Sequence, residues 1–92
     1  MNVFVAKKTG QHQSERFDPV KLHQSVTAAC LAVRTLEGEA HQVAQKTCEK
    51  VIDWLSNKTE VTSSDIRRIA AEGLRIYHPE AAYVYEHYRV MI

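Results

Sequence analysis

Phe17-Asp18-Pro19-Val20-Lys21-Leu22 is the stretch that divides this chain into two parts of different structure. An Asp before a helix accepts hydrogen bonds from the free N–H groups of the first turn. Pro at the first helical position loses no hydrogen bond, because that N–H has no partner inside a helix. The stretch therefore predicts that a helix begins after Asp18.

Before this boundary the sequence predicts a β-hairpin over residues 3–17. The alternation in Val3-Phe4-Val5-Ala6 is typical of a short strand. A polar connection over residues 9–14 follows, and residues 15–17 are interpreted as the return strand.

After the boundary, apolar residues recur at helical spacing. The first two stripes consist of Leu22, Val26, Ala29 and Val33, and of Val43, Thr47, Val51 and Leu55 with Trp54 beside them. Glu37-Gly38-Glu39 breaks the pattern between the two stripes, and Asn57-Lys58-Thr59 is expected to end the second helix.

Glu60-Val61-Thr62 is interpreted as either a third strand or an extended lead-in. Thr62 and Asp65 have the spacing of a capping box, which predicts the start of a third helix. Pro79, after His78, is predicted to begin a fourth helix. The stripes of these two helices are Ile66, Ile69, Ala70, Gly73 and Tyr77, and then Ala82, Tyr85, Tyr88 and Ile92.

These elements predict a mainly helical α+β fold. A length of 92 residues suits a single domain, here residues 1–92. We expect a four-helix bundle over residues 18–92, capped at one end by the hairpin of residues 3–17 or by a small three-stranded sheet that contains it.

Composition excludes several classes of protein. The formal net charge is +1, which favours neither a nucleic-acid coat nor an acidic partner. No apolar run reaches the ~20 residues that a membrane span needs. Residues 1–8 become charged too early for a signal peptide, and two cysteines make no disulfide framework. A cytoplasmic protein is the expectation.

No pattern in the sequence predicts catalysis or a metal site. The glycines are too widely separated for a phosphate-binding loop, and no spacing places a nucleophile beside a base. Cys30 and Cys48 lie next to apolar stripe positions and are interpreted as buried small side chains. Five histidines are interpreted as surface residues: His12, His23, His41, His78 and His87. We therefore expect no enzyme, no catalytic residue and no protein-bound metal.

Cations gather around the predicted start of the first helix. Lys7 and Lys8 end the first strand, Arg16 lies on the return strand, and Lys21 lies in the first helical turn. A helix N-terminus carries free N–H groups and partial positive charge, so cations beside it favour a polyphosphate. On composition alone, a solvated surface is the better explanation of these charges.

Four blocks of the sequence resemble the ATP-cone family, in the order in which the family has them. They are Val5-Ala6-Lys7-Lys8-Thr9-Gly10, Phe17-Asp18-Pro19-Val20-Lys21-Leu22, Val61-Thr62-Ser63-Ser64-Asp65-Ile66 and Ala82-Tyr83-Val84-Tyr85-Glu86-His87-Tyr88-Arg89. Together they span about residues 3–89, which is nearly the whole chain.

The resemblance implies a domain that binds ATP or dATP, with Mg²⁺. In the family such domains regulate ribonucleotide reductases, or the repressor of their genes, by changing how subunits assemble. The site residues that the resemblance implies are Lys7, Lys8, Lys21, Ser63 and Arg67 for the phosphates, Val5, Glu15, Phe17 and Asp18 for the adenine, and Arg89 as a further cation. Tyr85 and Tyr88 also match the family, but their helical spacing predicts core positions.

Two functions follow as hypotheses. The first is an adenine-nucleotide-binding regulatory module that acts through oligomerisation, a partner protein or a fused domain. The alternative is a helical protein-interaction or DNA-associated module that binds no nucleotide, supported by Arg67, Arg68 and Arg75. Asp65 and Glu72 offset those charges, so no continuous basic stripe remains for direct contact with DNA.

Overall fold

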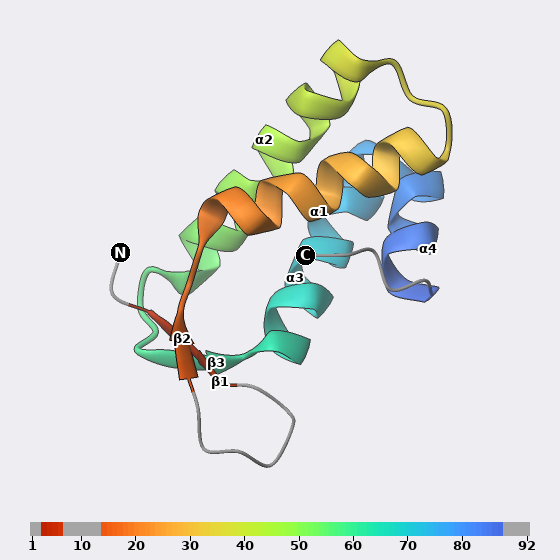
Figure 1. The fold of residues 1–92 in the computed structure, drawn as a ribbon. Helices are drawn as coiled ribbons and strands as arrows, with labels where there is room; N and C mark the ends of the chain where they lie inside the picture. Colours follow the sequence, from red (N-terminus) through yellow and green to blue (C-terminus); the bar gives the residue numbers. More distant parts are fainter. Residues whose placement is uncertain (1–2, 7–13, 88–92) are drawn as a thin grey trace.

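A computed structural model describes residues 3–6 and 14–87 of the chain. Three strands and four helices lie within these residues (Figure 1). In chain order they are β1 (Phe4–Ala6), β2 (Ser14–Arg16), α1 (Pro19–Ala32), α2 (Glu37–Leu55), β3 (Glu60–Thr62), α3 (Ser63–Tyr77) and α4 (Pro79–His87). The predicted α+β fold, mainly helical and with a small sheet at one end of the bundle, is confirmed.

The sheet has the order β2-β1-β3, with β1 antiparallel to β2 and parallel to β3. Residues 60–62 therefore form a third strand, which decides between the two interpretations of that segment. Val5 is paired with Glu15 on one side and with Val61 on the other. The return strand ends one residue earlier than predicted, and the N–H of Phe17 donates to the carbonyl of Val3 at 2.7 Å.

The predicted start of α1 is confirmed. The Asp18 Oδ1 atom accepts a hydrogen bond from the N–H of Val20 at 2.9 Å, and Pro19 is the first helical residue. The helix ends at Ala32, and Arg34 in the following turn has a φ of 64°. This left-handed conformation turns the chain back toward α2.

The prediction that Glu37-Gly38-Glu39 breaks the helical pattern is wrong, because these residues form the first turn of α2. Two acidic side chains are stabilised in a first turn by the partial positive charge of a helix N-terminus. Gly38 is exposed, and a Cβ atom added there would meet no other atom within 4 Å. The interruption lies at residues 33–36 instead.

The four helices pack in a closed arrangement, α1 on α2, α2 on α3, α3 on α4 and α4 back on α1 (Figure 1). Val26, Val51, Leu55, Leu74 and Tyr85 are fully buried between them. Tyr85 therefore lies in the core, as its spacing predicts, and it makes its contacts at the junction of α1, α3 and α4.

Tyr77 departs from the predicted stripe of α3. It is the last residue of the helix and is 39% exposed, with the Lys46 Nζ atom 5.6 Å from the centre of its ring. A residue at a helix end has fewer neighbours from the facing helices. An apolar position there is accordingly less buried than its spacing suggests.

Cys30 and Cys48 are buried free thiols, as predicted. Burial, with a smaller contribution from Glu39, raises the pKa of the Cys30 thiol to about 11. Burial, with a smaller contribution from Glu49, raises the pKa of the Cys48 thiol to about 11 as well. Both side chains are thus protonated at neutral pH and act as small apolar groups.

The histidines follow the surface prediction only in part. His41 and His87 are exposed, whereas His23 and His78 are half-buried. His78 Nε2 lies 2.7 Å from Thr35 Oγ1, and the ring of His23 stacks on that of His41 at 5.4 Å between centres. Contacts between helices, which sequence spacing does not reveal, bury these two rings. His12 lies outside the described residues.

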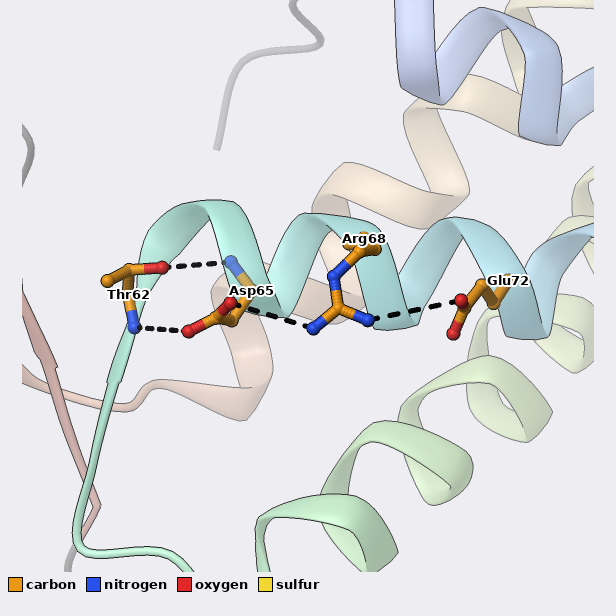
Figure 2. Close-up of polar contacts among 4 residues, drawn as sticks. All are labelled: Thr62, Asp65, Arg68 and Glu72. Carbon is orange, nitrogen blue, oxygen red and sulfur yellow. Dashed lines mark hydrogen bonds and ion pairs between the residues drawn. The ribbon is translucent and has the colours of Figure 1, made fainter.

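The capping box that begins α3 is present (Figure 2). The N–H of Asp65 donates to Thr62 Oγ1 at 3.0 Å, and the N–H of Thr62 donates to Asp65 Oδ2 at 3.2 Å. Two backbone donors at the helix start are thereby satisfied by local side chains.

Substitution Thr62→Ala is expected to lower the free energy of unfolding by ~1 kcal/mol, because it leaves the N–H of Asp65 without its acceptor. Urea denaturation followed by circular dichroism measures the change. Ser64→Ala, two residues further on at an exposed position, is the matched control and should leave the stability nearly unchanged. Equal losses from the two substitutions would contradict this account of the helix start.

Asp65 also predicts a pH dependence. The backbone N–H of Thr62, followed by weaker contributions that include Arg68, lowers the pKa of this carboxyl below its ordinary 3.8. A lowered pKa in the folded state gives stability that is present above the unfolded pKa and is lost as the pH falls through the folded pKa. The stability difference between the protein and its Asp65→Asn variant should therefore shrink between pH 5 and pH 2. A difference that stays constant over this range would refute the assignment.

Candidate functional site

A cavity of about 150 Å³ lies where the sheet meets the first turns of α1 and α3. It is open to solvent on one side. Its lining residues are Val5, Glu15, Arg16, Asp18, Lys21, Leu22, Ser63, Ile66, Arg67 and Tyr85. Residues separated by up to 80 positions in the sequence therefore share one wall.

Local structure explains how these side chains are brought together. Val5 and Glu15 are direct partners in the β1–β2 ladder, so they lie side by side. Lys21 lies in the first turn of α1, which the Asp18 cap fixes, and Ser63 is the first residue of α3. The two helices both begin at the cavity, and helix N-termini carry partial positive charge.

Three cations and two carboxylates line the cavity. Within residues 3–6 and 14–87, no carboxylate oxygen lies within 4.0 Å of the charged groups of Arg16, Lys21 or Arg67. The carboxylate of Asp18 already accepts the N–H of Val20. Among the described lining residues the cations thus outnumber the carboxylates by one, and none of the three cations is in an ion pair with a described carboxylate, which suits an anionic ligand.

Arg67 differs from the two other arginines on α3. Its Nη1 atom donates to the backbone carbonyl of Tyr85 at 3.1 Å, and its guanidinium carbon lies 5.2 Å from the centre of the Tyr85 ring. The side chain is half-buried, with a hydrogen bond to an uncharged group and no ion pair among the described residues. Its charge is therefore held in place at the cavity.

Arg68 and Arg75 are paired with carboxylates instead. The Arg68 guanidinium lies between Asp65, at 3.6 Å, and Glu72, at 4.0 Å, along the outer side of α3 (Figure 2). Arg75 forms an ion pair with Glu86 of α4. The expectation that acidic neighbours offset the charges of α3 is thus confirmed for Arg68.

The remaining wall of the cavity is apolar. Val5, Leu22, Ile66 and Tyr85 form it. The Tyr85 hydroxyl lies 3.1 Å from Ser25 Oγ on α1, and burial raises the pKa of Tyr85, so the ring is neutral. An apolar wall beside an excess of cations fits a ligand with one apolar part and one anionic part.

The site residues expected from the sequence fall into three groups. Six of them line this one cavity: Val5, Glu15, Asp18, Lys21, Ser63 and Arg67. Phe17 is not among the lining residues, and its side chain is packed in the core. Lys7, Lys8 and Arg89 lie outside the described residues. The nucleotide-binding roles of all ten stay predictions.

Sequence reasoning missed four lining residues. Arg16 was noted among the clustered cations but not assigned to the site, and Leu22, Ile66 and Tyr85 were assigned to apolar stripes. The first apolar residue of a helical stripe lies near the helix start, where the core ends, and it can line a cavity there. Leu22 and Ile66 are such residues. Proximity to the two predicted helix starts was the signal that could have found Leu22 and Ile66.

Within residues 3–6 and 14–87, no group of three or more His, Cys, Asp or Glu side chains is placed to hold a metal ion. None of the described helices combines the length and the apolar character needed to cross a membrane.

Comparison with known proteins adds one finding. The family model of the ATP cone domain matches residues 4–91. No curated protein and no solved structure gives a significant match. The matched range includes every residue that lines the cavity.

Proposed function

The chain belongs to the ATP-cone family, whose domains are nucleotide-binding regulatory modules, and on this premise we propose that it binds ATP or dATP in the cavity between the sheet, α1 and α3. The bound nucleotide changes how the protein assembles with itself, with a partner protein or with a fused domain. In this proposal the chain is cytoplasmic and catalyses no reaction. Its binding of nucleotide regulates ribonucleotide reduction.

The observation that carries the proposal is the set of three cations at the cavity that have no ion pair with any carboxylate in the described part of the chain. Lys21 approaches the cavity from the first turn of α1, Arg67 from the start of the second turn of α3, and Arg16 from β2. Hydrogen bonds between such cations and phosphate oxygens are charge-assisted and are stronger than bonds between neutral groups. Ser63, the first residue of α3, supplies a hydroxyl and a backbone N–H at the same place.

The apolar wall supports a nucleotide over a simple phosphate. The adenine ring lies against Val5 in this proposal, with Leu22 and Ile66 beside it and with Glu15 and Asp18 as acceptors for its amino group. Mg²⁺ arrives with the triphosphate, since this ion keeps most of its water and is commonly held through phosphate oxygens. Lys7, Lys8 and Arg89 are proposed as additional phosphate ligands on the strength of the family match.

In this proposal the contact made on assembly covers some of the exposed apolar side chains. Leu31, Leu36, Ile76 and Tyr83 are 46%, 76%, 65% and 58% exposed. They lie on four different elements or connections, away from the lining of the cavity. Apolar side chains of this size gain free energy when an interface covers them.

Calorimetric titration with ATP and magnesium tests the site. We expect a dissociation constant in the micromolar range, or roughly −7 to −8 kcal/mol. Arg67→Ala should weaken binding by about tenfold or more, because each lost charge-assisted bond costs about 1.5–3 kcal/mol. Arg68→Ala is the matched control one residue away, and it should bind ATP like the unmodified protein.

Lys21→Ala provides a second test that does not alter α3 or α4, and it should weaken ATP binding to a similar degree. Circular dichroism establishes that each variant is folded. Equal losses from Arg67→Ala and Arg68→Ala would place the site elsewhere. A flat titration at millimolar ATP and dATP would overturn the proposal and favour an interaction module that binds no nucleotide.

The output is tested by light scattering coupled to size-exclusion chromatography. We expect the mass of the protein to change when saturating ATP or dATP is added, because a ligand shifts an assembly equilibrium by its different affinities for the two states. Leu36→Ser, at the most exposed of the large apolar positions, is expected to reduce that change. A mass that stays constant with both nucleotides would exclude self-assembly and leave a partner or fused domain as the output.

A further inference from the structure

A side chain of α3 is hydrogen-bonded to the backbone of α4. The helix α4 is described from Pro79 to His87. Arg67 on α3 donates from Nη1 to the carbonyl of Tyr85 at 3.1 Å. The bond therefore joins the two helices at this point.

The same guanidinium lines the cavity. Arg67 belongs to the cavity wall in the conformation in which it holds the Tyr85 carbonyl. A guanidinium has five N–H donors in a rigid planar fork, and the bond to the carbonyl engages only one of its nitrogen atoms. An anion in the cavity can therefore accept hydrogen bonds from Arg67 without displacing it from α4.

The acceptor is itself well anchored. The Tyr85 side chain is fully buried, its hydroxyl lies 3.1 Å from Ser25 Oγ on α1, and its ring lies below the guanidinium. The bond from Arg67 thus links the cavity to a point of α4 that is fixed by the core. Arg68 offers no such link, because its partners Asp65 and Glu72 both lie on α3.

We propose that Arg67 is a positioning residue that couples the cavity to α4: a phosphate group bound in the cavity fixes the guanidinium and thereby strengthens its hydrogen bond to the Tyr85 carbonyl of α4. The inference rests on the proposed function, since it requires the anion to be the phosphate chain of the nucleotide. A long side chain loses conformational entropy when it is held in one geometry. When the phosphate and the carbonyl both bind the guanidinium, this entropy is lost only once for the two hydrogen bonds. Each bond therefore makes the other more favourable.

Amide hydrogen exchange measures the coupling. The amides of residues 84–87 of α4 exchange through local opening of the helix, and a stronger bond from Arg67 to the Tyr85 carbonyl slows that opening. The last turn of α2, residues 52–55, is the internal reference, because it contributes no residue to the cavity. We expect saturating ATP to slow the α4 amides by about fivefold or more relative to this reference.

Matched variants isolate Arg67. Arg67→Met keeps the length of the side chain and removes every donor, whereas Arg68→Met makes the same change one residue away. At ATP concentrations that saturate each protein by calorimetry, the effect on α4 should persist in Arg68→Met and disappear in Arg67→Met. Protection of α4 that is as large in Arg67→Met as in the unmodified protein would overturn the proposal.

The outcomes separate this inference from the proposed function. If calorimetry detects no ATP binding, the proposed function fails and the inference fails with it. If ATP binds and the α4 amides of the unmodified protein do not slow, only the inference fails. If Arg67→Met does not fold, inorganic tripolyphosphate on the unmodified protein replaces it: slowing of the α4 amides by this bound anion supports the coupling, and bound anion without slowing overturns it.

Discussion

The parallel pairing of β1 with β3 is the constraint on which the site depends. Residues 4–6 pair with residues 60–62, and the N–H of Phe4 also donates to the carbonyl of Thr59 at 3.1 Å. Parallel strands require a long crossover, and α1 with α2 provides it here. This short ladder fixes the hairpin against the start of α3, so that Val5 and Glu15 face Ser63 and Arg67 across one cavity. Without it, the hairpin would be joined to the bundle through the core packing of Val3, Val5 and Phe17 and through the start of α1.

Much of the fold could be predicted because its boundaries are set by local chemistry. The caps at Asp18 and Thr62 act over two or three residues, so the sequence displays them directly. The predicted start of α2 is wrong because Glu37 and Gly38, which begin the helix, interrupt the apolar pattern and so indicate a break between two stripes. The separation of the helices depends instead on the left-handed turn at Arg34, and no glycine marks that position.

The candidate site could be predicted only in outline. The sequence shows the basic residues, and the resemblance to the family implies which of them belong to the site. Neighbouring residues on a helix point about 100° apart, so Arg67 and Arg68 meet different surroundings although the sequence presents them as equals. The first faces the cavity and bonds to α4, while the second pairs with carboxylates on its own helix. That difference arises from the crossing of α3 and α4, which no local pattern encodes.

The residues that line the cavity come from different elements of the fold, and this determines how a bound ligand can affect the protein. Val5 and Glu15 come from the sheet, Lys21 from α1, Arg67 from α3 and Tyr85 from α4. Because no single element holds the site, a ligand that contacts several walls gains affinity only when those elements are held together. By linkage, its binding free energy then opposes any motion that separates the sheet from the helices or α4 from α3. A small domain whose elements are joined by a ligand in this way can report occupancy through the rigidity of its surface, and it needs no catalytic group for that purpose.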